Sequence, residues 1–468
     1  MKLKLKNIGT LKQAEVDLSK DLIILAGPNN TGKTYAAYTV YGVCDLLRKA
    51  DILSYSKSFL VSADFMSRWA SDSGEVKIES YINDFINSVT ESFNQQSSQY
   101  LRNIFATDES KFSKSEIQIV FDTDLLKAKL LDFPNSIHKG LNSISVPYKN
   151  YEISKFVGDD NFKYKLIGDK KGDKYNIHSI EAFLEIQKYL SRLIIDFYFN
   201  NLYINTAERS AINVFSRQLS IKIHNIVDEF LQIRDSKKGD ANQILNKLQR
   251  YPSPIRDSLT IAEDLANLSR NKSEYGFLAD RIEEVLLDGK ITTSKDGEVQ
   301  YSPNKSYSPN KSKVKNLSIH LTASIVKSLS NLVFYFRHLA QKGDFIIIDE
   351  PELNLHPDNQ RKVARLLGEI INHGFKVMIS THSDYIIREL NNLIMLKSGG
   401  EKANYLADKY GYEEKQLIDY QRVGAYLFNH NKNVLLEVTE TGFEVDTINE
   451  EINNLNNAAE EIYLTLFD

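Results

Sequence analysis

Gly27-Pro28-Asn29-Asn30-Thr31-Gly32-Lys33-Thr34 stands between an apolar run at residues 22–26 and a helical pattern from residue 34 to about residue 49. This order of strand, glycine-containing loop and helix matches a phosphate-binding loop of the Walker A type. Two glycines permit a tight curl, so backbone N–H groups and the positive end of the helix converge on an anion. The motif predicts that all eight residues bind ATP, with the Lys33 charge on the β- and γ-phosphates and the Thr34 hydroxyl on Mg²⁺.

A second stretch, Phe345-Ile346-Ile347-Ile348-Asp349-Glu350, places two carboxylates directly after four apolar residues. Such a run predicts a buried parallel strand, and α/β sheets bind ligands at the carboxyl ends of such strands. We expect Asp349 to hold Mg²⁺ through water and Glu350 to polarise the attacking water as general base. Taken alone, Asp-Glu after an apolar run is also an ordinary strand end. Its position downstream of the phosphate loop favours the catalytic interpretation.

A third stretch, residues 376–384, predicts a strand that ends in polar groups. An isolated histidine is more often structural, but His382 follows a strand that comes next in the chain after the acidic pair. We therefore expect His382 to donate a hydrogen bond to the γ-phosphate. The catalytic candidates are Glu350, His382 and Lys33, and the candidate metal ligands are Thr34 and Asp349.

Composition limits the class of protein. The 468 residues suffice for two or three domains. A net charge of −4 with mixed signs provides no general attraction to nucleic acid or membrane, so any DNA contact needs a local patch. The single cysteine, Cys44, excludes an intrachain disulfide and a Cys-based zinc site. No apolar run approaches the length of about 18 residues that a membrane helix needs, so we expect a cytoplasmic protein without membrane contact.

The two nucleotide motifs are much further apart than a phosphate-loop core requires. The expected fold is therefore α/β, a P-loop NTPase head with a mixed sheet flanked by helices and a large, mostly helical insertion between the motifs. The expected divisions are 1–50 (first half of the head), 51–200 (insertion), 201–215 (a return strand), 216–315 (second part of the insertion), 316–400 (second half of the head) and 401–468 (C-terminal hairpin and helix).

Within these divisions, periodicity predicts further elements. Expected strands are an antiparallel hairpin at 2–18, then 117–121, 151–167, 201–205, 317–321, 423–428, 434–438 and 443–445. Expected helices are 77–105, 179–199, 324 to about 341, 358–373, 403–410 and a final helix. The tandem repeat at 301–306 and 307–312 predicts a loop. Basic and aromatic residues at 162–175 favour a solvated hairpin face over a nucleic-acid contact.

The final helix has Thr447 as expected N-cap and Glu450 three residues later, a capping box. Its apolar residues recur at alternating spacings of four and three. Packing on its own head is the expected arrangement, and pairing with another subunit is the alternative. Glu437, Glu444 and Asp446 also permit a metal-nuclease interpretation, although their spacing suits the solvent face of a hairpin.

Residues 27–34, 348–357 and 381–384 together resemble the ABC/SMC-like ATPases of the OLD-type group found in bacterial antiphage defence. Residues 206–210 resemble the Pro-Ala-Glu-Arg-Ser element of that group, with Thr206 in place of proline. The resemblance implies that Arg209 approaches the nucleotide. The helix start at Ala323 and Ser324 resembles a reduced signature motif, which implies that Ser324 contacts the γ-phosphate held by the opposing subunit.

Nucleases of this group carry a TOPRIM domain after the ATPase, and we expect no room for one here. The chain then resembles the stand-alone ATPase subunits of antiphage systems such as PARIS and Septu. That resemblance implies a homo-oligomer, at least a dimer with shared ATP sites, which controls an effector such as a TOPRIM-type nuclease in trans. A phage product or nucleic acid would be the trigger. The alternatives are an SMC-like DNA-repair or DNA-binding ATPase with a coiled-coil insertion, a transporter ATPase subunit and a self-contained OLD-like nuclease.

Overall fold

The computed structural model describes most of the chain. The described residues are 1–49, 73–133, 143–148, 151–166, 189, 191–215, 251–294, 297–304, 316–430 and 432–467.

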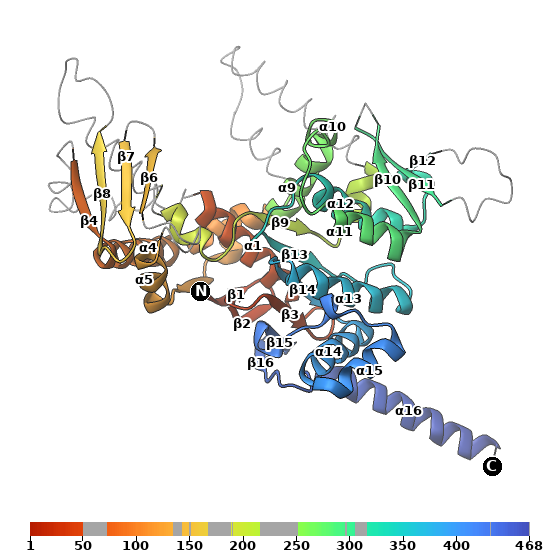
Figure 1. Cartoon of the computed structure of the whole chain (residues 1–468). Helices are drawn as coiled ribbons and strands as arrows, with labels where there is room; N and C mark the ends of the chain where they lie inside the picture. Colours follow the sequence, from red (N-terminus) through yellow and green to blue (C-terminus); the bar gives the residue numbers. More distant parts are fainter. Residues whose placement is uncertain are drawn as a thin grey trace, which may run out of the picture.

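A nine-stranded mixed sheet forms the centre of the molecule (Figure 1), in the order β5-β1-β2-β16-β15-β3-β14-β13-β9. Its strands are β1 (Lys2–Ile8), β2 (Leu11–Asp17), β3 (Leu22–Ala26), β5 (Glu116–Val120), β9 (Leu202–Asn205), β13 (Phe345–Asp349), β14 (Lys376–Thr381), β15 (Val423–Asn429) and β16 (Lys432–Leu436). The expected α/β class and mixed sheet are confirmed.

The strands that carry the predicted motifs are parallel neighbours. β3 pairs with β14, β14 with β13, and β13 with β9, all in parallel register. Every residue of β3 and β13 is buried, as expected for strands covered on both faces. The predicted hairpin of β1 and β2 and the predicted return of β9 to this sheet are confirmed.

Helices cover both faces of the sheet, and the side chains of β3 alternate between the two resulting cores. Ile23 and Leu25 belong to the core shared with α1 (Lys33–Lys49) and α4 (Ile78–Phe105). Leu22, Ile24 and Ala26 belong to the core shared with α12 (Ser324–His338), α13 (Pro357–Asn372) and α14 (Asp384–Ser398). None of the helices in the described ranges is long and apolar enough to cross a membrane.

The segment between the motifs divides between the main sheet and two peripheral parts. β5 pairs with β1 and extends the main sheet, although it lies in the segment expected to be an insertion. One peripheral part is a sheet of order β4-β8-β7-β6, next to α4 in Figure 1. It comprises β4 (Ser73–Lys77), β6 (Ser143–Tyr148), β7 (Tyr151–Phe156) and β8 (Asn161–Leu166), with η1 (Glu109–Phe112) and α5 (Thr123–Leu131) nearby in sequence. The expected helix at 179–199 lies partly outside the described residues.

The second peripheral part packs on α12. It comprises α9 (Ser253–Glu263), α10 (Leu265–Leu268), α11 (Gly276–Ile282), the π-helix η2 (Glu283–Leu287), β10 (Gly289–Thr293), β11 (Val299–Pro303) and β12 (Leu317–Ser318). The first three residues of the tandem repeat, 301–303, lie in β11, so the expectation of a loop is wrong there, because they pair with β10. The rest of the repeat lies outside the described residues. The expected strand at 317–321 is reduced to two residues, followed by the 3-10 turn η4 (Ile319–Leu321).

The C-terminal region differs most from expectation. After α15 (Gly400–Tyr410), the turns η5 (Glu414–Gln416) and η6 (Tyr420–Arg422) and the β15–β16 hairpin, residues 443–445 form no strand. The Asn391 side chain bonds the backbone of Phe443 on both sides and takes the place of a partner strand. The final helix α16 (Asp446–Phe467) already includes Thr447, so the expected capping box is wrong.

α16 also leaves the body of the protein. Figure 1 shows it extending away from α14 and α15 with the C-terminus at its far end. None of its residues is buried by the part of the chain that the structure describes. Leu455 and Leu466 are 71% and 67% exposed. The expected packing of this helix on its own head is therefore wrong for all but its first turns, where Ile448 contacts the core.

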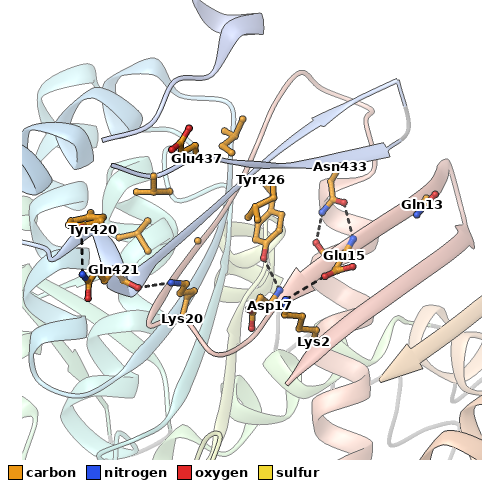
Figure 2. Close-up of a pocket in the computed structure, with 15 residues that line it drawn as sticks. Lys2, Gln13, Glu15, Asp17, Lys20, Tyr420, Gln421, Tyr426, Asn433 and Glu437 are labelled. Atoms are coloured by element: carbon orange, nitrogen blue, oxygen red, sulfur yellow. Dashed lines mark hydrogen bonds and ion pairs between the residues drawn. The ribbon is translucent and has the colours of Figure 1, made fainter. Parts of the chain in front are cut away.

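A groove of about 880 Å³ lies between β2 and the β15–β16 hairpin (Figure 2). β16 pairs with β2 only at Lys432 and Gln13. Beyond that point the Asn433 amide bonds the backbone N–H and C=O of Glu15 at 2.8 and 2.7 Å, and the Tyr426 hydroxyl accepts from the N–H of Asp17 at 2.8 Å. The groove adjoins the amino end of β15, opposite the sheet edge that carries the predicted site.

Candidate active site

The predicted site residues follow the carboxyl ends of four adjacent parallel strands. The loop 27–34 follows β3, His382 follows β14, Asp349 ends β13, and Arg209 is the first residue of the helix that follows β9. Because parallel strands end at the same edge of a sheet, segments hundreds of residues apart in the chain meet there. Thr34 Oγ1 lies 3.5 Å from Asp349 Oδ1. The phosphate loop and the acidic strand therefore form one site, as the sequence predicts.

Both glycines of the loop adopt conformations that other residues rarely occupy. Gly27 has φ +137° and Gly32 has φ +100°. A Cβ on Gly27 would lie 2.2 Å from the backbone oxygen of Phe428 in β15. Lys33 Nζ donates to the carbonyl oxygens of Gly27 and Pro28, at 2.8 Å each. The lysine thus lies inside the curl of the loop, at the start of α1.

The Asp349 carboxylate is enclosed by neighbouring residues of the site. Ser380 Oγ donates to its Oδ1, whereas Oδ2 is buried and accepts no hydrogen bond from the described residues. A carboxylate with a free oxygen beside a threonine hydroxyl fits Mg²⁺, which usually takes only one or two protein oxygens and completes its shell with water and phosphate. The described residues contain no group of three or more His, Cys, Asp or Glu side chains that could hold a metal by themselves. The site therefore fits a nucleotide-bound ion rather than a metal held by protein alone.

Glu350 has a strained backbone. Its φ is +50°, which costs a non-glycine residue on the order of 1 kcal/mol. Its N–H donates to the carbonyl oxygen of Ser380 at 3.0 Å and lies 3.2 Å from that residue's Oγ. The chain therefore turns sharply at the end of β13, and the half-buried Glu350 remains at the sheet edge. Strain of this kind is typical of functional positions.

Arg209 binds the backbone beneath the acidic pair. Its guanidinium donates to the carbonyl oxygens of Thr206 at 3.0 Å, Asp349 at 2.7 Å and Glu350 at 2.6 Å. The side chain is only 1% exposed. The contacts described for it are with the protein backbone, and the expected contact with nucleotide stays a prediction. The sequence signals were its position after a return strand and the resemblance at residues 206–210, and neither indicated these backbone contacts.

Burial is the largest cause of the pKa shifts of Lys33 and Asp349. Burial lowers the pKa of Lys33, and the charges of Glu350, Glu352 and Asp349 oppose that shift. Burial also raises the pKa of Asp349 to about 6; the Ser380 and Thr34 hydroxyls oppose the rise and the Glu350 charge adds to it. Asp349 thus holds its charge at a cost in the free protein, and a cation would relieve that cost.

Replacing Asp349 with asparagine is expected to stabilise the nucleotide-free protein at neutral pH. Because the folded pKa of Asp349 is raised, the folded state binds more protons than the unfolded state between about pH 4 and pH 6, and its stability falls as pH rises through that window. The asparagine removes this loss, a gain of up to about 3 kcal/mol above pH 6 that vanishes below about pH 4. Thermal unfolding of both proteins across pH measures it. Equal midpoints at pH 7.5 would contradict the expected charge burial.

Sequence analysis predicts no role for Glu352, which the structure connects to His382. Glu352 Oε1 accepts from Thr381 Oγ1 at 2.8 Å and from the His382 N–H at 2.8 Å, and lies 3.3 Å from His382 Nδ1. The only sequence signal was its proximity to Glu350. Thr381 and His382 lie in a different part of the chain, so the contact could not be read from spacing.

Ser324 is not joined to the phosphate loop by any contact among the described residues. It is the exposed first residue of α12, and Ala323 is the N-cap, without a side-chain bond from the described residues. Neither Thr322 nor Ser324 is the N-cap of α12, and Thr322 Oγ1 donates to the Ile319 carbonyl oxygen. Ser328 lies 3.1 Å from Ser210, oxygen to oxygen, and is fully buried. The contact of Ser324 with an opposing subunit's nucleotide stays a prediction.

A curled phosphate loop, an acidic strand end beside it and a histidine on the intervening strand define an ATPase of the P-loop class. The chain belongs to the family described as "AAA ATPase domain", which matches residues 1–387. Residues 1–387 of the chain are therefore an ATPase domain.

Two curated relatives match short segments. The energy-coupling factor transporter ATP-binding protein EcfA of Methanothermobacter thermautotrophicus is 28% identical over 108 residues, which cover 23% of this chain and 34% of that protein. The phosphonates import ATP-binding protein PhnC 1 of Pseudomonas aeruginosa is 38% identical over 65 residues, which cover 14% of this chain and 23% of that protein. The chain thus spans about a third or less of the length of these relatives.

Among solved structures, the SMC head domain of Pyrococcus furiosus, bound to the C-terminal domain of ScpA, covers 98% of both chains at 13% identity and a TM-score of 0.32. The SMC head domain of Thermotoga maritima covers 94% of this chain and 98% of its own at 9% identity and a TM-score of 0.29.

Proposed function

We propose that this ATPase is an oligomeric switch whose nucleotide state controls an effector supplied by another chain, as in bacterial antiphage systems. The ATP-dependent part of this proposal rests on one observation: Thr34 Oγ1 lies 3.5 Å from Asp349 Oδ1. This contact brings two motifs that are distant in sequence to the same edge of the sheet. The antiphage assignment is supported by the motif resemblance at residues 206–210 and 348–357, and by the parallel pairing of β9 with β13 that brings the first of these segments to the site.

In this proposal, residues 27–34 bind the phosphates, with Lys33 directed at the β- and γ-phosphates. Thr34 and Asp349 hold Mg²⁺, which supplies positive charge to the phosphate oxygens. Glu350 accepts a proton from the attacking water, and its position at the sheet edge leaves it room to do so. His382 donates to the γ-phosphate; its side chain is 42% exposed and accessible to a ligand.

We propose further that two copies of the chain pair through α16. The seam consists of Ile448, Ile452, Leu455, Ala459, Ile462 and Leu466. Five of the nine residues from 449 to 457 are asparagine, a poor helix former, so an isolated helix of this sequence is marginal in water and needs a partner.

Charge favours a second copy as that partner. Heptad positions beside the seam hold Asn449, Glu451, Asn456, Ala458, Tyr463 and Thr465, with only one carboxylate among them. The remaining acids of the helix beyond its first residue, Glu450, Glu460 and Glu461, lie on the opposite face. Two copies can therefore approach through their seams with little repulsion, and the side chains that are exposed in one chain become buried.

Introducing glutamate at Leu455 and Ile462 together is expected to abolish the nucleotide-free dimer, because two buried charges on each helix would face each other. Light scattering during size-exclusion chromatography measures the mass. The matched control, Asn454→Glu with Asn457→Glu, adds the same charge to the outer face and should leave the dimer intact. A wild-type monomer without nucleotide, or a dimer indifferent to the seam charges, would contradict this arrangement.

The switch itself is tested by co-expression with neighbouring genes. A subunit that co-purifies with this chain and is released or activated on ATP addition, and that stays bound to the Lys33→Ala variant, supports the proposal. An ATPase that hydrolyses ATP with no effect on any co-purified subunit would refute the switch and leave the ATPase class intact.

The described residues give less support to the alternative, an SMC-like DNA-repair ATPase. A DNA-bridging arm needs two long helices in sustained contact, whereas the described part of the insertion contains the sheet β4-β8-β7-β6. Within that sheet Phe162 is buried, and Lys163 lies 3.5 Å from Asp159 and 3.7 Å from Glu75. The basic residues of this cluster at 170–174 lie outside the described residues.

A further inference from the structure

We propose that Glu352 is a positioning residue for ATP hydrolysis, which holds His382 in the orientation that contacts the nucleotide. This inference rests on the role of His382 in the proposed function and assigns the residue through which that role is maintained.

One carboxylate oxygen of Glu352 holds the whole segment that carries the histidine. Oε1 accepts from Thr381 Oγ1 and from the backbone N–H of His382, and it lies 3.3 Å from His382 Nδ1. Thr381 Oγ1 in turn accepts from the N–H of Ser383 at 3.0 Å. These contacts hold the turn after β13 against the turn after β14. His382 is thus held both through its backbone N–H and through its ring.

The contact with Nδ1 determines what the ring can offer to a phosphate. A carboxylate at Nδ1 favours a hydrogen on that nitrogen and directs Nε2 away from it. Nε2 is then the ring nitrogen that is directed at a phosphate oxygen. The Glu352 carboxylate, 3.3 Å from Nδ1, therefore holds the ring in the orientation that this contact requires.

The surroundings of Glu352 fit a functional role better than a structural one. The residue is 5% exposed, and its second oxygen, Oε2, is buried without a hydrogen bond from the described residues. A buried carboxylate kept for stability alone would be expected to use both oxygens. Its charge acts on Lys33 and Arg209, so it belongs to the same charge network as Asp349 and Glu350.

A double-mutant cycle tests whether Glu352 acts through His382. Glu352→Ala and His382→Ala are each expected to lower the turnover number about 10- to 100-fold, with nucleotide affinity changed less than about threefold. The double variant should lose no more than His382→Ala alone, because the two residues act as one unit. Glu352→Gln, which retains an acceptor oxygen without the charge, should show an intermediate loss and serves in the cycle if the alanine variant does not fold.

The matched control is Asp384→Asn. This carboxylate lies two residues after His382 but bonds Arg388 instead, at 2.6 and 2.8 Å, and its removal should leave turnover unchanged. If the fold-loss of turnover in the double variant equals the product of the two single losses, the inference is overturned while the role of His382 remains intact. Wild-type turnover in His382→Ala would instead remove the histidine from the proposed function itself.

Discussion

Replacement of Glu350 by glutamine is expected to lower the turnover number for ATP hydrolysis about 100- to 10,000-fold, the usual range for loss of a general base. Glutamine has nearly the same shape, so the backbone with φ +50° and its contact with Ser380 should remain. Only the group that accepts the proton of the attacking water is lost. Nucleotide affinity should therefore change little, since this interaction develops only in the transition state.

Lys33→Ala provides the contrasting variant. It removes a charge that lies inside the phosphate loop, where Nζ contacts the Gly27 and Pro28 carbonyl oxygens, and it should weaken nucleotide binding itself. Equilibrium binding and steady-state hydrolysis, measured on both variants, separate the two roles. Turnover at the wild-type level in Glu350→Gln would exclude Glu350 as general base, and unaltered affinity in Lys33→Ala would exclude a lysine contact to the phosphates.

The central strands could be predicted because local sequence and tertiary environment agree there. β3 and β13 are short apolar runs, each followed by residues that a nucleotide site requires, and both are fully buried. The phosphate loop permits little variation of residue type at two positions, since Gly27 and Gly32 occupy backbone regions that few other residues tolerate. The motifs and the apolar pattern were therefore sufficient to predict that Lys33, Thr34 and Asp349 lie at one edge of the sheet.

The C-terminal region could not be predicted because long-range contacts override its local pattern. Residues 443–445 alternate like a strand, but Asn391 from α14 satisfies the backbone of Phe443. Thr447 fits the pattern of a helix cap, yet α16 begins at Asp446. The 3-4 spacing of the apolar residues in α16 did predict a helix. Spacing alone carries no information on whether the apolar stripe contacts its own head or another chain.

In the site itself, residue types were predictable and their partners were not. Asp349, Glu350 and His382 follow recognisable strand ends. Their supporting contacts come from Arg209 and Glu352, and each joins segments that are distant in sequence. A motif identifies the groups that touch a ligand, whereas the residues that orient these groups depend on which strands become neighbours.

Removal of the Arg209 side chain is expected to be the most disruptive single change in the site. Arg209→Ala removes the guanidinium hydrogen bonds to the carbonyl oxygens of Thr206, Asp349 and Glu350, and it removes a buried cation that faces three carboxylates. Breaking one side of a buried ionic network typically costs about 3–5 kcal/mol. We therefore expect a clear drop in the thermal midpoint, measured without nucleotide by calorimetry or fluorescence.

Turnover should fall as well, because the Arg209 bond to the Glu350 carbonyl oxygen, at 2.6 Å, opposes relaxation of the strained Glu350 backbone. Arg209→Lys separates charge from geometry, since lysine retains the cation but has no planar fork to reach several carbonyl groups at once. It should recover part of the stability and little of the turnover. The matched control is Arg388→Ala, which removes an exposed arginine paired with Asp384 and should cost at most about 0.5 kcal/mol. If Arg209→Ala unfolds at the wild-type temperature, or if Arg209→Lys turns over ATP normally, then the guanidinium does not maintain the Glu350 conformation.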